Sequence, residues 1–347
     1  MTNVTRVARW LRRRRALRRR FNPYVVGTPV FDRSLLFGRE KLTAWILALL
    51  ASRSVRLTGE RRIGKTSFLH HLRKALVSRE ARGFFPVFVD LEGVTALRLS
   101  RVLMEETVEA LALQPRRLGL RVDGRHGGYD ARDLVHDVKR VVRDLCERTG
   151  AEARLVFLVD EVEAVLPDPE SDGAWLDTLL EECSQELRVV LAGAGGSRPV
   201  ASRRERRRLE DLVLQPLQAD DARALVTRPV AGRFRYEARA VDRIVQLAQG
   251  RPYLLQKLCL NALNRMLDEG RTTVALADVE AVADPEAESP CWSAPGVTGA
   301  SQSAQCANHP TEQFMARAKN SGTFRACAAD DRPVASNGTR CGSIDVQ

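Results

Sequence analysis

The segment GERRIGKTS (Gly59–Ser67) has the residue types and the spacing of a loop that binds phosphate groups. Its fixed positions, Gly59, Gly64, Lys65 and Thr66, match the pattern G-x-x-x-x-G-K-[ST]. The two glycines let the backbone approach a phosphate closely, and successive N–H groups at the start of the following helix form a concave anion site. Lys65 would neutralise phosphate charge, and the Thr66 hydroxyl would be a ligand of Mg²⁺. The segment therefore predicts a site for a phosphate-bearing ligand.

The motif is more specific than its length suggests. With 23 Gly and 6 Lys in 347 residues, the four fixed positions coincide by chance in roughly one such chain in 400. Lys65 adds weight because 49 of the 55 basic residues are Arg, whereas the compact ammonium of Lys fits between phosphates. The remaining residues of the segment are expected to line the same site: Glu60, Arg61, Arg62, Ile63 and Ser67.

A second segment, LVFLVDE, ends an apolar run with two carboxylates, Asp160 and Glu161. Asp160 would lie at the carboxyl edge of a sheet, where it can hold Mg²⁺ through water. Glu161 would orient and deprotonate an attacking water molecule. An acidic pair at a solvated strand end looks the same in sequence. The pair lies about 95 residues after the glycine-rich loop, with a strand and helices between them. This position favours the pair as part of the phosphate site over a solvated strand end.

The elements that position these residues follow from the apolar patterns. Strands are predicted at VRLT (55–58), FFPVFVDLEG (84–93), Leu155–Val159 and LRVVLAGAGG (187–196), and helices at about 41–51, 65–78, 131–149 and 175–186. A helical region is expected up to about Leu113, and the segments FNPYVVGTPV and RVDGRHGG are expected to be loops. Continuous apolar strands that alternate with helices indicate an α/β fold, with a parallel sheet covered on both faces.

The chain divides into four predicted parts. An arm (1–20) precedes the α/β domain (21–210), and a small helical domain (211–285), beginning near LEDLVLQPL, precedes a tail (286–347). Leu occurs 43 times up to residue 276 and never after it, so no packed core is expected in the tail. The tail is interpreted as a disordered extension or as a segment read out of frame.

The net charge of +11 comes mainly from the arm, which holds nine Arg and no acid, so that residues 21–347 carry only +2. Such a run is typical of a disordered, solvated tail, and the alternative is contact with nucleic acid or an anionic membrane. No apolar run approaches the ~18 residues of a transmembrane helix. Seven scattered Cys without a CxxC pair favour a reducing cytoplasm.

Taken in order, these segments resemble a P-loop ATPase of the AAA+/STAND group, nearest to bacterial and archaeal members with an origin-recognition-like module. The resemblance covers about residues 21–285 and rests on NPYVVGTPV with LFGRE, GERRIGKTS, FVDLEG, LVFLVDE, LRVVLAGAGG, LQPLQADDARALVTRPV and GRPYLLQKLC. It implies a P-loop NTPase sheet sandwiched by helices and followed by a small all-α lid domain. The implied cofactors are ATP and Mg²⁺. The choice of adenine rests on this resemblance, since no Asn-Lys-x-Asp signature for guanine is present.

The resemblance also implies roles for single residues. Gly38 and Arg39, in the segment FGRE, match a motif that flanks the adenine pocket. In the segment GRP, Pro252 would pack near the base and Arg251 would reach the terminal phosphate as a second sensor. A plain turn between two helices is the alternative for this segment. Asp90 ends a strand whose edge faces the site in relatives.

Two features depart from the family pattern. Relatives usually end the fourth strand with a polar sensor, whereas here the first polar side chain is Ser197. The arginines of the loop Ser202–Arg208 lie where ring-forming relatives place an arginine finger, although a solvated face is the favoured interpretation. After Pro285 no effector module is recognisable.

Metal sites other than that for Mg²⁺ are not predicted, and His70 and His71 are expected to be packing or surface residues.

The predicted function is an ATP-binding regulatory or signalling ATPase, a conformational switch with slow Mg²⁺-dependent hydrolysis in which Glu161 and Lys65 act catalytically. The alternatives are an ATP-regulated nucleic-acid-binding protein and a non-hydrolysing, nucleotide-gated scaffold. The expected partners are ATP or ADP, an effector protein that the sequence does not identify, and further copies in a homo-oligomer.

Overall fold

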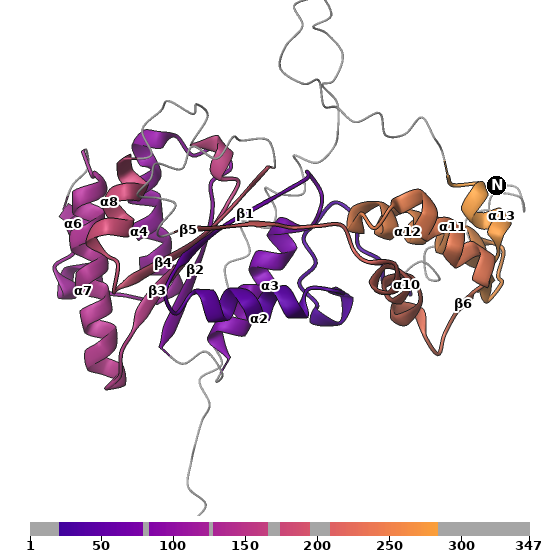
Figure 1. The fold of residues 1–347 in the computed structure, drawn as a ribbon, viewed down its shortest axis with the longest axis horizontal. Coiled ribbons are helices and arrows are strands. Elements are labelled where there is room, and N and C mark those ends of the chain that lie inside the picture. Colours follow the sequence, from indigo (N-terminus) through magenta and orange to yellow (C-terminus); the bar gives the residue numbers. More distant parts are fainter. Residues whose placement is uncertain (1–20, 79–82, 125–127, 166–173, 195–208, 284–347) are drawn as a thin grey trace, which may run out of the picture. The chain divides into compact units, whose positions relative to one another are not determined.

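The apolar runs predicted as strands pair in parallel in a single five-stranded sheet, ordered β2-β3-β4-β1-β5 (Figure 1). The computed structural model describes residues 21–78, 83–124, 128–165, 174–194 and 209–283. The strands are β1 (Ser54–Gly59), β2 (Phe84–Asp90), β3 (Arg154–Asp160), β4 (Leu187–Ala194) and β5 (Leu209–Val213). β4 therefore separates β1, which precedes the glycine-rich loop, from β3, which ends in Asp160. This arrangement confirms the predicted parallel α/β sheet.

Helices cover both faces of the sheet. α2 (Glu40–Leu49) and α3 (Lys65–Val77) share one apolar cluster with alternate residues of the strands. α4 (Leu99–Ala110), α7 (Ala131–Thr149) and α8 (Ala174–Glu182) share another cluster with the residues that point the opposite way. In β3, for example, Phe157 belongs to the second cluster and Leu158 to the first. This alternation explains why the strand is apolar throughout.

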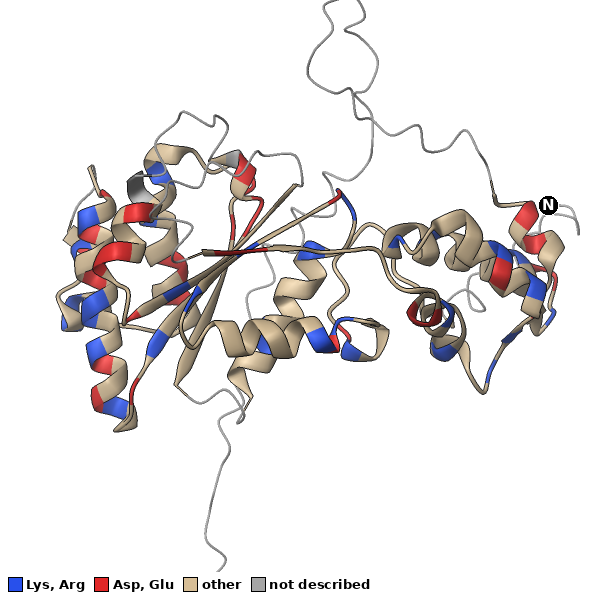
Figure 2. Cartoon of the chain, in the orientation of Figure 1, with Lys and Arg blue, Asp and Glu red and all other residues tan. Residues whose placement is uncertain are grey.

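α7 spans the residues predicted for this helix, 131–149. The Asp130 side chain accepts hydrogen bonds from the N–H groups of Arg132 and Asp133, and Asp133 completes a capping box. Gly150 ends the helix in the left-handed conformation. Figure 2 shows charges of both signs alternating along this helix, which is typical of a solvated outer face.

Two predictions of local structure are wrong. The segment Leu209–Leu217 is not helical, because Leu209–Val213 forms β5 on the free edge of β1. Leu209 and Leu212 are buried three residues apart, a spacing that also suits a helix. The segment Arg121–Gly128 is not all loop, because Arg121–Gly124 is a short helix, α6. It forms because the buried Asp137 carboxylate accepts its first two N–H groups.

The helical region after β5 has its own apolar cluster. It contains α10 (Ala219–Thr227), α11 (Ala238–Ala248), α12 (Pro252–Asp268) and α13 (Leu276–Glu280), with β6 (Arg235–Tyr236) and β7 (Thr273–Val274) as a two-residue parallel pair. The remaining short elements are η1 (Arg33–Leu35), η3 (Ala96–Arg98), α5 (Pro115–Leu118), η4 (Val162–Ala164) and η5 (Arg228–Val230). The division at residue 210 stays a prediction, and it falls within β5.

An N-terminal strap, residues 21–39, runs from the helical region to the sheet. Tyr24 and Phe37 lie in the apolar cluster of the helical region, and the Tyr24 hydroxyl donates to the carbonyl oxygen of Val226. Further along, the N–H of Val30 donates to Oγ of Ser67 on α3 at 2.9 Å. The strap thus contacts both parts of the described chain, which belong to one compact unit.

Candidate functional site

The glycine-rich loop joins the end of β1 to the start of α3. β1 ends at Gly59 and α3 begins at Lys65. Gly64, just before the helix, has φ = 96°, in the left-handed region that side chains rarely adopt. A Cβ at Gly59 would lie 3.1 Å from both the Ile63 side chain and the carbonyl oxygen of Leu214. The path of the backbone therefore explains why the motif has glycine at both positions.

The start of α3 presents donors toward the loop. Gly64 has no side chain to cap the first amides of this 13-residue helix, so they are available to an anion. The Lys65 ammonium donates to the carbonyl oxygens of Gly59 and Glu60, each at 3.1 Å. Burial lowers the pKa of Lys65, and the carboxylates of Glu163 and Asp160 oppose that shift. This combination of amides and ammonium suits a polyanion.

Asp160 lies at the carboxyl end of β3, opposite Asp90 of β2 in the strand register. Its side chain is 3% exposed. Burial raises the pKa of the Asp160 carboxyl, while the nearby Thr66 hydroxyl and the N–H of Glu161, which donates to it at 3.1 Å, oppose that shift. The Thr66 hydroxyl thus lies near enough to the Asp160 carboxylate to favour its charged form.

Glu161 adopts the left-handed backbone conformation, with φ = 53° and ψ = 43°, which is uncommon for a residue with a side chain. Its side chain is exposed. Desolvation raises the pKa of the Glu161 carboxyl, and the carboxylates of Glu92 and Asp90 raise it further. Asp90 itself accepts the N–H of Glu92 at 3.0 Å. The end of β2 therefore adds negative charge beside Glu161.

Sequence reasoning missed Glu163, which follows in η4. Its Oε1 accepts the N–H of Ala194, the last residue of β4, at 3.1 Å. Its Oε2 is buried and has no hydrogen-bond partner in the described part of the chain. A Cβ on Gly193 would lie 2.8 Å from this oxygen, so only glycine leaves room for the carboxylate. The acid three residues after Asp160 was the visible signal, but its contact with β4 depends on the fold.

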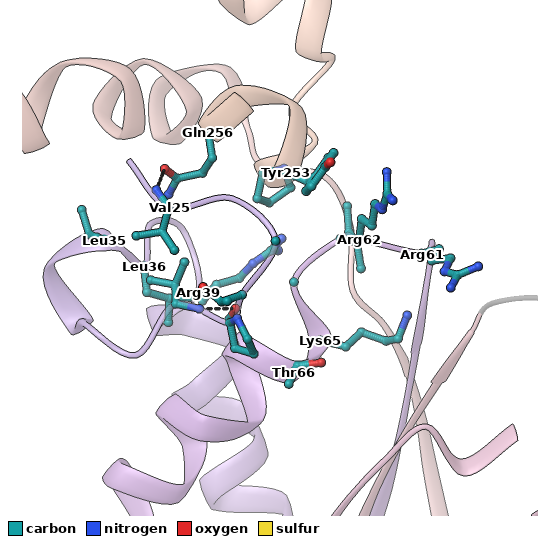
Figure 3. A pocket seen from close by; sticks show the side chains of 18 of the residues that line it. Val25, Leu35, Leu36, Arg39, Arg61, Arg62, Lys65, Thr66, Tyr253 and Gln256 are labelled. Carbon is teal, nitrogen blue, oxygen red and sulfur yellow. Dashed lines mark hydrogen bonds between the residues drawn. The ribbon is translucent and has the colours of Figure 1, made fainter. Parts of the chain in front are cut away.

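One cavity of about 730 Å³ is lined by Lys65, Thr66, Asp160, Glu161 and Glu163 together. Figure 3 shows side chains that line it, including Lys65 and Thr66 of the loop region, Arg39 of the strap, and Tyr253 and Gln256 of α12. The full lining consists of Val25, Gly27, Thr28, Pro29, Val30, Leu35, Leu36, Phe37, Arg39, Arg61, Arg62, Ile63, Gly64, Lys65, Thr66, Ser67, Asp160, Glu161, Glu163, Ala194, Leu217, Leu225, Pro252, Tyr253 and Gln256.

The end of the cavity formed by the strap is largely apolar, with one buried cation. Arg39 is 7% exposed, and its Nη2 has no hydrogen-bond partner among the described residues. Burial lowers the pKa of its guanidinium, against the opposing effect of Asp221 and Glu40. At the neighbouring Gly38, a Cβ would collide with the Asp221 carboxylate. The segment that the resemblance assigned to a base pocket thus contributes Phe37 and Arg39 to the cavity wall, whereas Gly38 packs on Asp221.

α12 supplies another part of the wall, which the sequence predicted only through Pro252. Gln256 accepts the N–H of Val25 through Oε1 at 3.1 Å, shown as a dashed line in Figure 3. The Tyr253 ring lies 4.5 Å below the Arg62 guanidinium, a cation–π contact. Arg62 also has a positive φ of 63°. No local sequence signal identified Tyr253 or Gln256, since each depends on a partner far away in the chain.

Four predicted site residues, all within the described chain, do not line the cavity: Gly38, Gly59, Glu60 and Arg251. Arg251 instead forms an ion pair with Glu60 of the loop, with 3.3 Å between Nε and Oε2. Gly250, with φ = 73°, packs directly on the backbone of Leu217. A contact of Arg251 with a phosphate stays a prediction. Ser197, the loop Ser202–Arg208, the arm and the tail lie outside the described residues.

Comparison with protein families identifies the group. The family model of the novel STAND NTPase 1 matches residues 30–281. The chain belongs to this family. The resemblance to AAA+/STAND ATPases that the motifs indicated is thereby confirmed. No curated protein matches the sequence of this STAND NTPase.

Solved structures share its fold at low sequence identity. The Aeropyrum pernix ORC2 protein, in ADPNP–ADP complexes, is 14% identical, with a TM-score of 0.54 over 77% of this chain and 71% of that chain. Cdc6p from Pyrobaculum aerophilum is 15% identical, with a TM-score of 0.50 over 76% and 69%. Drosophila ORC bound to DNA is 15% identical, with a TM-score of 0.51 over 78% of this chain. This STAND NTPase spans 65% of that Drosophila chain, just under two thirds of its length.

None of the helices in the described residues combines the length and the apolar character needed to cross a bilayer. Within the same residues, no three His, Cys, Asp or Glu side chains are grouped so as to hold a metal ion by themselves. Mg²⁺ does not require such a group, because it commonly binds one or two protein oxygens together with phosphates and water.

Proposed function

We propose that this STAND NTPase binds ATP with Mg²⁺ in the 730 Å³ cavity, hydrolyses it slowly and acts as a nucleotide-dependent switch. The observation that carries the proposal is the convergence of two motifs about 95 residues apart. The loop ending in Lys65–Thr66 and the strand ending in Asp160 both line this cavity, where the Asp160 carboxylate acts on the charge of Lys65.

The remainder of the cavity has the character of a nucleoside site. Leu35, Leu36 and Pro252 offer apolar surface for a base, and the Tyr253 ring also contributes to the lining. The unpartnered Nη2 of Arg39 offers a buried donor to an acceptor atom on the ligand. A polar phosphate end and an apolar end with a few convergent donors are what a nucleotide requires.

The donor set also fits Mg²⁺. The Thr66 hydroxyl and the desolvated Asp160 carboxylate line the same cavity, and both are oxygen ligands of the kind that Mg²⁺ prefers. When bound, the ion would neutralise the developing charge on the phosphates. Lys65 would exchange its hydrogen bonds to the loop carbonyls for bonds to phosphate oxygens, since its ammonium already lies over the loop.

Glu161 is the residue proposed to orient the attacking water and to accept its proton. The raised pKa of its carboxyl makes it a better base than an ordinary glutamate. Its side chain is exposed, so a loosely held water is expected. The described part of β4 also ends without a polar side chain, at Ala194. Both features support slow turnover.

The switch follows from the composition of the cavity wall. Strap, glycine-rich loop and α12 all contribute side chains, so one bound nucleotide would contact all three. A ligand shifts an equilibrium between arrangements by its difference in affinity for them. Because the terminal phosphate distinguishes ATP from ADP, loss of that phosphate would alter the preferred arrangement.

The test measures ATP binding and phosphate release by the full chain with Mg²⁺. We expect Lys65→Ala to weaken ATP binding by at least tenfold, because a charge-assisted contact is worth about 1.5–3 kcal/mol. Glu161→Gln should bind ATP as the wild type does and release phosphate at least ~100-fold more slowly. Lys41→Ala and Glu109→Gln, both on exposed helix surfaces, are the matched controls. Absence of ATP binding by the wild type would overturn the proposal.

A second candidate is ATP-regulated binding of nucleic acid. It is favoured by the nine Arg in residues 1–20 and by the fold shared with Drosophila ORC, which was solved bound to DNA. Phosphate contacts by such an arm would make the affinity fall steeply with salt. Duplex DNA binding at 50 and 200 mM salt, with and without residues 1–20, tests this candidate. A DNA affinity that is unchanged by the deletion would show that residues 1–20 do not contribute to DNA binding.

A further inference from the structure

The carboxylate of Glu163 lies where β4 ends, beside the start of the glycine-rich loop. Its partner Ala194 is paired with Gly59 in the parallel register of β4 and β1. Glu163 is also the first of the three carboxylates that act on the charge of Lys65. The side chain therefore forms part of the wall at the phosphate end, at the strand end where the sequence offered no polar side chain.

The carboxylate is held in this position. Oε1 accepts the N–H of Ala194 at 3.1 Å, and Oε2 packs against the backbone of Gly193, where a Cβ would approach it to 2.8 Å. The neighbouring Val162 side chain would lie 2.9 Å from the same Cβ. A carboxylate clamped between a strand end and its own turn cannot swing away into solvent when a ligand enters.

The position of Lys65 indicates which part of a nucleotide would reach Glu163. In a loop of this pattern the backbone N–H groups bind the first two phosphates, and the lysine reaches the last two. Lys65 donates to the carbonyl oxygen of Gly59, which is paired with Ala194, the partner of Glu163, so the last phosphate would lie near Glu163. That last phosphate is present in ATP and absent from ADP.

We propose that Glu163 makes this site discriminate nucleoside triphosphate from diphosphate, by placing a fixed negative charge at the terminal-phosphate end that a divalent cation must offset. The inference rests on the proposed nucleotide site and adds a determinant of its specificity. Asp160 accepts the N–H of Glu161, whereas Oε2 of Glu163 has no hydrogen-bond partner in the described chain. Its charge therefore acts on whatever occupies that end of the cavity. Without Mg²⁺, ATP would be repelled more strongly than ADP.

The experiment measures the dissociation constants of ATP and ADP for the full chain, each in Mg²⁺ and in EDTA. Glu163→Gln keeps an acceptor for the N–H of Ala194 and removes the charge. In EDTA, we expect this variant to bind ATP about tenfold more tightly than the wild type, the effect of removing one nearby like charge. ADP affinity should change by less than about twofold, because the added negative charge of ATP is what Glu163 faces. In Mg²⁺ the gain in ATP affinity of this variant over the wild type should be smaller than in EDTA.

Controls separate this role from a structural one. Glu109→Gln removes a charge from an exposed surface of α4 and should leave all four constants unchanged. Glu163→Ala loses the hydrogen bond to Ala194 as well. It should still show the changed ratio of ATP affinity to ADP affinity. If Glu163→Gln leaves the ratio unchanged, or if both variants weaken ATP and ADP equally, Glu163 only links η4 to β4 and the inference is overturned.

The two proposals fail in different ways. If the wild type binds ATP in Mg²⁺ and Lys65→Ala does not, an unchanged ratio in Glu163→Gln overturns only the role of Glu163. If the wild type binds neither nucleotide in Mg²⁺, the proposed function is overturned and the role of Glu163 with it.

Discussion

Arg39 illustrates how a residue can serve a ligand at the expense of the fold. The residue is 7% exposed, and one nitrogen of its guanidinium has no partner in the described chain. Burying a charge without full pairing is costly, and apolar replacement of buried charges is often neutral or stabilising. The residue is therefore better explained by nucleotide binding than by stability.

This explanation predicts opposite effects of Arg39→Met on binding and on stability. ATP affinity should fall about tenfold or more, because hydrogen bonds to charged groups are worth about 1.5–3 kcal/mol. The free energy of unfolding without nucleotide should stay within about 1 kcal/mol of the wild-type value or rise. Urea unfolding and equilibrium binding measure the two quantities, with the exposed Arg33→Met as control. A loss of several kcal/mol in stability would mean that Arg39 is a structural residue.

The rings of His70 and His71 should make the stability of the protein depend on pH. Burial is the main cause that lowers the pKa of both rings, and Lys74 contributes at each. The His70 ring stacks on Phe88, with 4.2 Å between ring centroids. As pH falls below about 6.5, the unfolded chain takes up these protons before the folded one, so stability is lost. The loss should continue down to the lowered folded pKa.

The matching test compares the wild type with the double variant His70→Gln/His71→Gln. Urea unfolding at pH 7.5, 6.5 and 5.5 gives the free energy of unfolding of each protein. The wild type should lose more stability than the double variant between pH 7.5 and 5.5, because glutamine does not titrate. Only the slopes of the free energy of unfolding against pH are compared, since the loss of ring packing lowers the stability of the variant at every pH. Equal slopes would contradict the prediction.

The candidate site could be predicted in its contiguous parts and not elsewhere. Gly64, Lys65 and Thr66 act through the local geometry of a loop and a helix start, so their types and spacing carry the information. Glu163 and Gln256 act through N–H groups of residues 31 and 231 positions away. No local pattern encodes partners at such separations, and a glutamate after a strand or a glutamine on a helix is unremarkable in sequence.

At the scale of elements, Arg188 on β4 joins two helix ends. Its guanidinium donates to the carbonyl oxygens of Leu50 and Ala51, just after α2, and to that of Ser184, just after α8. Carbonyl groups at helix C-termini carry partial negative charge, which favours a cation there. Arg188 is only 6% exposed, so these acceptors have little access to water. The residue fixes α2 and α8 relative to the base of the sheet.

Arg188→Met should therefore destabilise the protein by about 3 kcal/mol, because it leaves several poorly hydrated carbonyl groups without donors. Arg53→Met is the matched control. Arg53 is exposed and pairs with Glu210 at 2.8 Å, and such surface pairs are worth about 0–1 kcal/mol. Urea unfolding of both variants and the wild type gives the comparison. Equal effects would show that the carbonyl groups are satisfied by water.

Element prediction succeeded where local residues set the limits of an element and failed where pairing decides. The predicted limits of α7 agree with the structure, in which Asp130 caps its start and Gly150 follows its end. The spacing of Leu209 and Leu212 suits a helix, yet the free edge of β1 supplies hydrogen bonds that make the segment a strand. Edge pairing of this kind depends on a partner about 150 residues away.

At the scale of the whole molecule, three segments distant in sequence form one cavity. The strap, the glycine-rich loop and the start of α12 all contribute to its lining. They are also in direct contact, through Val25 with Gln256 and through Arg62 with Tyr253. A nucleotide that fills the cavity should stabilise all three segments together, whereas a ligand of the loop alone should not.

Hydrogen exchange measures this coupling segment by segment. With Mg²⁺ and ATP at about 100 times the dissociation constant, binding should add about 2.7 kcal/mol to the free energy of unfolding. Exchange should slow in residues 24–39, 59–67 and 252–256 at once, because each segment lines the cavity. α7 contributes no residue to the cavity lining in the described chain. The exchange of those of its amides that exchange through local opening should therefore slow least. Lys65→Ala should abolish the protection in all three segments. Protection confined to 59–67 would mean that phosphate alone is recognised, and that the strap and α12 are not part of the switch.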